Sequence, residues 1–77
     1  MIYFDYLIAY KFTASGYIGS NDGTISVRRT HKIDSIEELE KTRKFIEEKI
    51  IENGYKEVAN VGIYNIVFLG EVNKETT

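Results

Sequence analysis

Hydrophobic and polar residues alternate along the first part of the chain. At the even positions of residues 2–13 every side chain is apolar or aromatic, whereas the odd positions are mixed. This period of two, in residue types that favour strands, is typical of a strand with one buried face. A second alternating segment, residues 24–33, follows a stretch with three glycines and the step Asp22-Gly23. Glycines and Asp-Gly steps favour chain reversal, so the two segments predict a β-hairpin.

A helix is predicted between residues 35 and 53. Ser35 and Glu38 have the spacing of a capping box, in which two side chains bond the free N–H groups of the first turn. Gly54 suits the left-handed conformation that ends many helices. Mostly apolar residues recur at helical spacing and form one stripe. The stripe consists of Ile36, Leu39, Arg43, Ile46 and Ile50, with Thr42 and Asn53 at its border and Phe45 and Ile51 outside it.

The chain is expected to close with a strand of about ten residues that ends near Val72. Both parities of this strand are apolar, and such a strand is usually covered on both faces. One parity holds Val61, Ile63, Val67 and Leu69, and the other holds Tyr64, Ile66 and Phe68.

The order ββαβ predicts an α+β fold, with a three-stranded mixed sheet in the order 2-1-3 and one helix on one face. Residues 1–72 are expected to form the single domain and residues 73–77 a flexible polar tail. Because one helix covers one face, we expect copies of the chain to associate, with the second face or an edge of the sheet between them. In the alternative, the tyrosines lie on the surface with their hydroxyl groups in water.

Composition excludes several classes of protein. The 77 residues include no cysteine, which excludes disulfides and thiolate zinc sites. Hydrophobic residues make up 43% of the chain, too many for a disordered protein. The net charge of −2 disfavours nucleic acid as a partner. The first residues lack the basic segment of a signal peptide, and no apolar run approaches the ~20 residues of a membrane helix, so a cytoplasmic location without membrane contact is expected.

Catalytic motifs are absent from the sequence. It has one histidine, His31, and none of the spacings that hold zinc, cradle a nucleotide phosphate or expose a serine nucleophile. A histidine at the end of an apolar strand face is more often hydrogen-bonded through one nitrogen than a general base. We therefore expect no enzyme, no metal and no cofactor.

Four potential cations lie within five residues of the second strand: Arg28, Arg29, His31 and Lys32. Guanidinium groups bind phosphate oxygens in pairs, so this group is a candidate site for an anion. The alternative is an edge strand that charge protects from aggregation. Arg29 and Arg43 are both expected to face the layer between sheet and helix, where a buried charge requires a partner such as a glutamate or a ligand phosphate. The alternative for Arg43 is that its charged end reaches water from the end of the stripe.

The glycine-rich segment and two tyrosines complete the candidate site. Backbone N–H groups with Ser20, Asn21 and Thr24 are expected to line an anion-binding concavity, while Tyr17 or Tyr64 stacks on a base. The alternative is a plain hairpin loop in which the glycines serve geometry alone.

The pattern resembles that of small ββαβ proteins from bacteriophages of Gram-positive bacteria, over roughly residues 3–70. The similar parts are the aromatic strand at residues 3–12, the turn at 16–19, the capped helix start at 33–39 and the closing segment 64–69. The resemblance implies a role in the conflict with host immunity, either by sequestering a signalling nucleotide or by blocking a defence protein. It assigns no catalytic or binding residue.

Together these observations predict a non-enzymatic, oligomeric phage-type protein in the host cytoplasm that sequesters a small anionic ligand such as a cyclic nucleotide signal. The alternative is a protein–protein inhibitor that presents a sheet edge, or the flank with Phe45 and Ile51, to a host defence enzyme.

Overall fold

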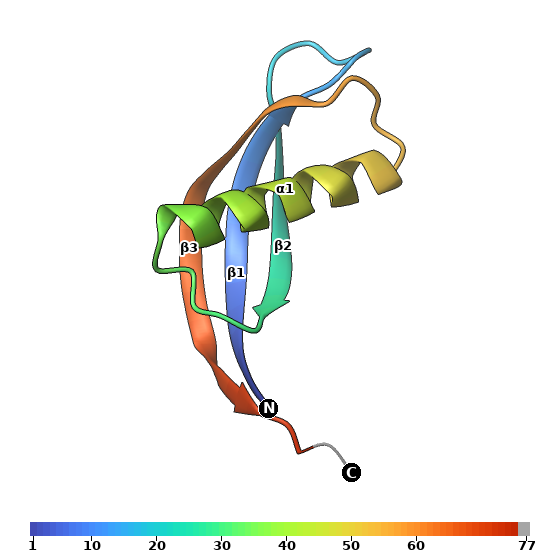
Figure 1. The fold of residues 1–77 in the computed structure, drawn as a ribbon. Helices are drawn as coiled ribbons and strands as arrows, with labels where there is room; N and C mark the ends of the chain where they lie inside the picture. Colours follow the sequence, from blue (N-terminus) through green and yellow to red (C-terminus); the bar gives the residue numbers. More distant parts are fainter. Residues whose placement is uncertain (76–77) are drawn as a thin grey trace.

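Three strands and one helix follow one another in the order β1, β2, α1, β3 in the computed structural model, which describes residues 1–75 (Figure 1). Their bounds are β1 Ile2–Thr13, β2 Asn21–Arg29, α1 Ile36–Glu52 and β3 Ala59–Asn73. The first strand and the helix match their predicted bounds. The second strand begins and ends earlier than predicted, because its ladder with β1 starts at the Phe12–Asn21 pair and stops at the Phe4–Arg29 pair.

The sheet has the order β2-β1-β3, and β1 is antiparallel to both neighbours. β2 and β3 therefore run in the same direction on either side of β1, as expected, but both neighbouring pairs are antiparallel, so the sheet is antiparallel rather than mixed. The predicted α+β fold with one helix on one face of a 2-1-3 sheet is confirmed.

Irregular pairing along β3 changes which of its side chains face the helix. Tyr6 lies opposite Phe68 while Asp5 lies opposite Gly70, so Leu69 is an extra residue on β3. The register shifts in the same way at Tyr64, between Ala9 and Tyr10 of β1. Each extra residue of a β-bulge reverses the alternation of the residues that follow it.

The predicted division of β3 into two parities is consequently wrong. The residues opposite the helix-facing positions of β1 are Ile63, Ile66 and Phe68, and Val61 joins the same buried cluster. Tyr64, Val67 and Leu69 belong to the other face. Gly70, directly after the bulge at Leu69, has φ 142°, a backbone conformation that residues with a side chain rarely adopt.

The helix begins at its predicted cap through the Ser35 half of the capping box, whereas the Glu38 side chain pairs with Arg29 instead. The Ser35 hydroxyl accepts a hydrogen bond from the Glu38 N–H at 3.2 Å, and Gly54 adopts φ 101° after the last turn. Its buried residues are Thr42, Ile46 and Ile50. Thr42 is fully buried, and its hydroxyl is satisfied there because it donates a hydrogen bond to the Glu38 carbonyl at 2.8 Å.

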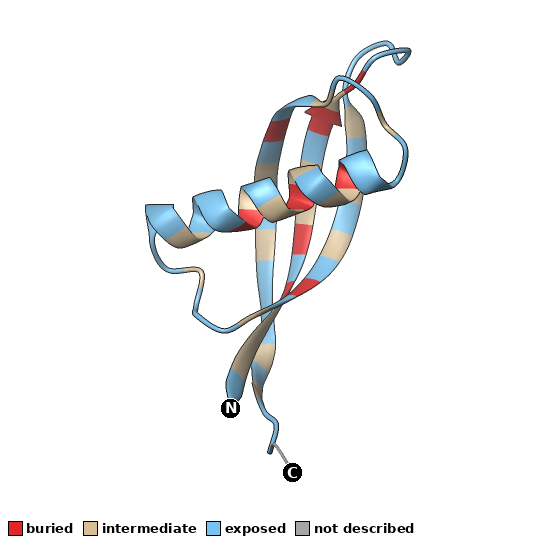
Figure 2. Cartoon of the chain, turned by 45° about the vertical axis from the view of Figure 1, so that its right-hand side comes forward, coloured by how far each residue is buried: buried red, intermediate tan, exposed pale blue. Residues whose placement is uncertain are grey.

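The predicted apolar stripe is wrong in the first turns of α1, where Ile36 and Leu39 are exposed. The helix crosses the strands rather than following them, and its N-terminal end projects past β3 (Figures 1 and 2). The sheet therefore does not extend beneath Ile36.

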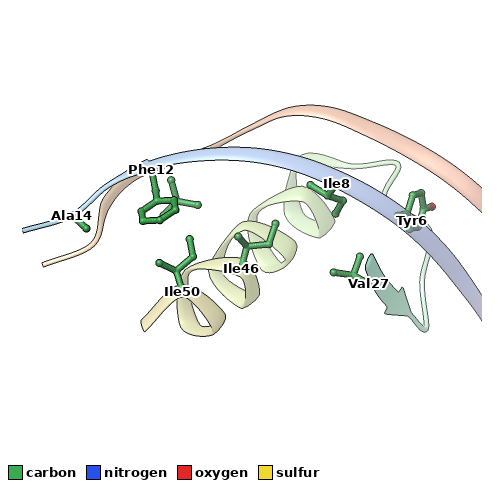
Figure 3. Packing of buried hydrophobic residues seen from close by; sticks show 8 residues of the cluster. Tyr6, Ile8, Phe12, Ala14, Val27, Ile46 and Ile50 are labelled. Carbon is green, nitrogen blue, oxygen red and sulfur yellow. The ribbon is translucent and has the colours of Figure 1, made fainter. Parts of the chain in front are cut away.

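The core lies where α1 crosses the sheet. Figure 3 shows Ile8 and Phe12 of β1 facing Ile46 and Ile50 of the helix, with Tyr6 beside Val27 of β2. Val27, Val61 and Ala14 complete the buried cluster. Outside this crossing the sheet has no second layer.

The end of β3 lies beside the start of the chain. The Lys74 N–H donates to the Met1 carbonyl at 2.9 Å, and the Met1 amino group donates to the Lys74 carbonyl at 2.8 Å. Of the expected tail, Asn73 is thus the last residue of β3, while Thr76 and Thr77 lie outside the described residues.

The substitution Ile46→Ala removes the centre of the helix–sheet contact. It should lower the free energy of unfolding by about 2–5 kcal/mol, because a cavity remains where a fully buried side chain was. Urea unfolding followed by circular dichroism measures the change. Ile51→Ala on the same helix is the control and should change stability by about 0.5 kcal/mol, since Ile51 is exposed. Equal losses in the two variants would contradict this assignment of the core.

Candidate functional site

The predicted ligand-binding residues are spread along the length of β2. Asn21 lies opposite Phe12 at one end of the ladder, and Arg29 lies opposite Phe4 at the other end. Arg29 is eight positions after Asn21, which corresponds to about 26 Å of strand. The structure therefore does not bring the loop residues and the basic residues into one site.

At the loop end, Tyr17 is exposed, and its ring lies 5.2 Å from that of Tyr55, a contact within the chain itself. Ser20 is exposed, while the side-chain nitrogen of Asn21 is buried without a hydrogen-bond partner among the described residues. Thr24 lies farther along β2, opposite Ala9. These four residues do not surround a common cavity.

At the other end of β2, Arg28 and Arg29 point to opposite faces of the sheet. Arg28 forms a two-pronged pair with Asp5, through its Nε and Nη2 atoms, each 2.8 Å from a carboxylate oxygen. Arg29 faces the helix and donates from Nη2 to Glu38 at 3.3 Å, which confirms its expected pairing in the sheet–helix layer. Both guanidinium groups are thus already bound to carboxylates.

These ion pairs change the acidity of their carboxyl groups. The hydrogen bonds from Arg28 hold the pKa of Asp5 below its ordinary value of 3.8. Burial raises the pKa of Glu38, but the hydrogen bond from Arg29 and the nearby charge of Lys41 together outweigh this effect. The pKa of Glu38 therefore lies below its ordinary value of 4.5. Both carboxyl groups are therefore negatively charged partners at neutral pH.

His31 and Lys32 lie in the connection between β2 and α1, beyond the end of the strand. Both are exposed, so the expected place of His31 on an apolar strand face is wrong, because the β1–β2 ladder stops at Arg29. The Nδ1 atom of His31 lies 3.2 Å from the Thr30 hydroxyl, and the Lys32 amino group lies 5.7 Å from the centre of the Phe4 ring.

Tyr64 is the extra residue of a bulge, on the face of the sheet away from the helix. The Lys11 amino group lies 5.2 Å from the centre of its ring. Arg28 sits opposite Asp5, farther along β1, so Tyr64 is not positioned to stack a base beside the predicted phosphate-binding residues.

The structure does gather apolar side chains on the face of the sheet opposite α1, which we call the open face. Leu7 of β1 lies directly opposite Val67 of β3, and both are exposed. Leu69 is 58% exposed and borders a shallow hollow that Asp5, Ser26 and Arg28 also line. Sequence reasoning missed this cluster because the bulge at Tyr64 separates Val67 and Leu69 from Val61 and Ile63, with which the regular alternation had grouped them. The glycines at 62 and 70 were the available signal, since glycine inside a strand often marks a bulge.

Charged residues at the two ends of the open face balance one another. Arg28 pairs with Asp5 at one end, and Lys11 lies opposite Asp22 in the β1–β2 ladder at the other. The face therefore has an apolar centre and a polar border without net charge.

Within residues 1–75, no group of three or more histidine, aspartate or glutamate side chains is arranged to hold a metal ion. No helix in this part of the chain is long and apolar enough to cross a membrane.

Comparisons of the chain with models of protein families, with curated proteins and with solved structures gave no match. The resemblance to phage proteins accordingly stays a prediction.

The substitution Arg28→Gln should raise the pKa of Asp5 toward 3.8, because the hydrogen bonds that stabilise the carboxylate are lost. A side-chain carboxyl titration by NMR measures this pKa. In the wild type the pair stabilises the fold above the ordinary pKa of aspartate, and this contribution disappears as the pH falls through the lowered native pKa.

Arg43→Gln is the control for this titration. It removes the partner that lowers the pKa of Glu40, so the Glu40 pKa should rise while that of Asp5 stays constant. An unchanged Asp5 pKa in Arg28→Gln would show that the pair does not form in solution.

Proposed function

We propose that this chain is a non-enzymatic protein-binding module that docks a partner protein on its open face. The observation that carries the proposal is the exposed cluster at the centre of that face, in which Leu7, Val67 and Leu69 adjoin one another across β1 and β3. Contiguous exposed apolar residues with a polar border are typical of protein–protein interfaces.

The border of the open face suits a protein partner. The Arg28 guanidinium, which pairs with Asp5, also lies 5.6 Å from the centre of the Tyr3 ring. The Lys11 amino group lies over the Tyr64 ring. Tyrosine and arginine are enriched in interfaces because they bury large surfaces while keeping a polar group at the rim. The expected partner surface is flat, apolar at its centre and close to neutral.

A small anionic ligand is less well supported by this arrangement. A phosphate that bound Arg28 would have to displace Asp5, and the freed carboxylate would then stand beside the phosphate charge. The same holds for Arg29 and Glu38 on the other side of the sheet. Sequestration of a cyclic nucleotide therefore stays a prediction that titration can test.

Nucleic acid is also disfavoured as the partner. Binding to a phosphate backbone requires several unpaired cations on one surface. The open face has as many acidic as basic residues, and the chain has a net charge of −2.

Inhibition of a host defence enzyme is the form of this function that the resemblance to phage proteins suggests. It needs no catalytic group on this chain, because covering a working surface of the target is sufficient. A location in the host cytoplasm belongs to the same proposal.

The substitution Leu69→Lys tests the docking surface. The wild-type protein, immobilised and exposed to a lysate of a Gram-positive bacterium, should retain one protein in stoichiometric amount. Leu69→Lys should reduce that retention by about tenfold or more, because a charge replaces an apolar contact at the centre of the interface. Quantitative mass spectrometry of the eluted proteins provides the measurement.

Ile18→Lys is the matched control, since Ile18 is fully exposed in the loop between β1 and β2, away from the open face. It should retain the same protein as the wild type. Equal retention by Leu69→Lys would contradict the proposal. Micromolar binding in calorimetric titrations with cyclic di- and trinucleotides, abolished by Arg28→Ala, would support the anionic-ligand function instead.

A further inference from the structure

The two edges of the sheet differ in charge. The nine residues of β2 include Asp22, Arg28 and Arg29, whereas the fifteen residues of β3 include one charged side chain, Glu71. An exposed edge strand offers unpaired N–H and C=O groups, and charged side chains commonly protect it from pairing with another chain. By this criterion β2 is a protected edge and β3 is not.

Part of the β3 edge is regular enough to pair. Residues 65–68 lie between the two bulges and keep an uninterrupted register with β1, from the Ala9–Asn65 pair to the Tyr6–Phe68 pair. The backbone N–H and C=O groups of this segment that do not bond β1 therefore point outward from the free edge of the sheet.

The helix extends over the position that an added strand would take. Its N-terminal end projects past β3, and Ile36 there is 77% exposed (Figures 1 and 2). Ile36, Leu39 and Ile66 line a groove of about 430 Å³ together with Ile33 of the preceding connection. A second hollow, which shares Ile33, reaches Phe68, whose ring is 52% exposed. We call the overhanging residues Ile36 and Leu39 the ledge.

We propose that β3 pairs antiparallel with β3 of a second copy of this chain, centred on residues 65–68, to form a two-fold symmetric dimer with a six-stranded sheet. In this arrangement each ledge covers the partner's β3, so the exposed isoleucine and leucine of each helix gain a layer of side chains beneath them. One symmetric contact thus satisfies the free edge and the uncovered helix turn of both chains.

A second copy fits this surface better than an unrelated strand for two reasons. Each chain supplies both the edge and the ledge, so the surface is complementary to itself, as a two-fold interface requires. Pairing of the two strands also places few like charges together along the shared edge, because Glu71 is the one charged side chain of β3, although each chain carries a net charge of −2. The outer edges of the dimer would be the charged β2 strands, which stops further growth of the sheet.

The available surface is large enough. A stable dimer buries about 800 Å² on each partner, roughly one seventh of the 5479 Å² of accessible surface of this chain. β3 has fifteen residues in a chain whose longest dimension is 45 Å, and the ledge and Phe68 add apolar side chains to its edge.

The mass in solution tests the dimer, with substitutions at the two ends of the helix. Light scattering of the wild-type protein at tens of micromolar should give twice the chain mass of 8.9 kDa. Ile36→Glu should raise the dissociation constant of the dimer by about 30-fold or more, because it places a carboxylate in the apolar contact between the ledge and the partner's β3. Ile51→Glu, at a residue 53% exposed near the opposite end of α1, should leave the mass unchanged. Circular dichroism verifies that both variants are folded.

Engineered cysteines locate the contact, because the chain has no cysteine of its own. Near a two-fold axis between antiparallel strands, a residue and its symmetry mate approach within disulfide distance. Asn65→Cys or Val67→Cys on β3 should therefore give a disulfide-linked dimer under mild oxidation, whereas Ser26→Cys on β2 should stay monomeric in a denaturing gel.

A monomeric wild-type protein would overturn the inference, as would equal dissociation by Ile51→Glu or equal crosslinking at Ser26. A monomer that loses its captured protein in Ile36→Glu would assign the ledge to a strand of another protein. Ile36→Glu leaves the open face unchanged, so its monomer should still retain the captured protein, and failure of the dimer is distinguishable from failure of the proposed function.

Discussion

The structure depends on the contact between one helix of 17 residues and a three-stranded sheet that is longer than the helix is wide. Ile46 and Ile50 reach the sheet around Ile8 and Phe12, and the buried side chains concentrate at this crossing. A single crossing helix leaves the second face of the sheet, the end of the sheet near the two termini (Figure 1) and the β3 edge without cover. Those uncovered regions hold many of the exposed apolar side chains and are the surfaces on which both proposed contacts rest.

Charge has a structural role in this small fold. The two arginines of β2 neutralise Asp5 on the open face and Glu38 beneath the helix, so they join secondary-structure elements that have little core between them. Exposed pairs of this kind add little stability each. Their main consequence is for recognition, because a guanidinium already held by a carboxylate is a poor site for a phosphate. The proposed binding of a partner protein therefore relies on apolar surface.

Local patterns were sufficient to predict much of the fold. The period of two in β1 and the Ser35 cap depend on neighbouring residues, and the 2-1-3 order follows from general rules of chain connection. The faces of β3 were not predictable in this way, since the bulges at Tyr64 and Leu69 arise from its register with β1, a strand about sixty residues earlier. The candidate ligand site failed for a simpler reason. Arg28 and Arg29 are adjacent in sequence, but adjacent residues of a strand face opposite sides of the sheet.

The open face and the β3 edge lie at right angles to each other, so one chain can use both at once. Pairing through β3 keeps all six strands in one sheet, and the two open faces then lie side by side on the same surface of the dimer. Leu69 and Val67 of each chain flank the shared edge on that surface, which would join two small apolar clusters into one larger one. Association of two copies would in this way enlarge the surface offered to a partner protein.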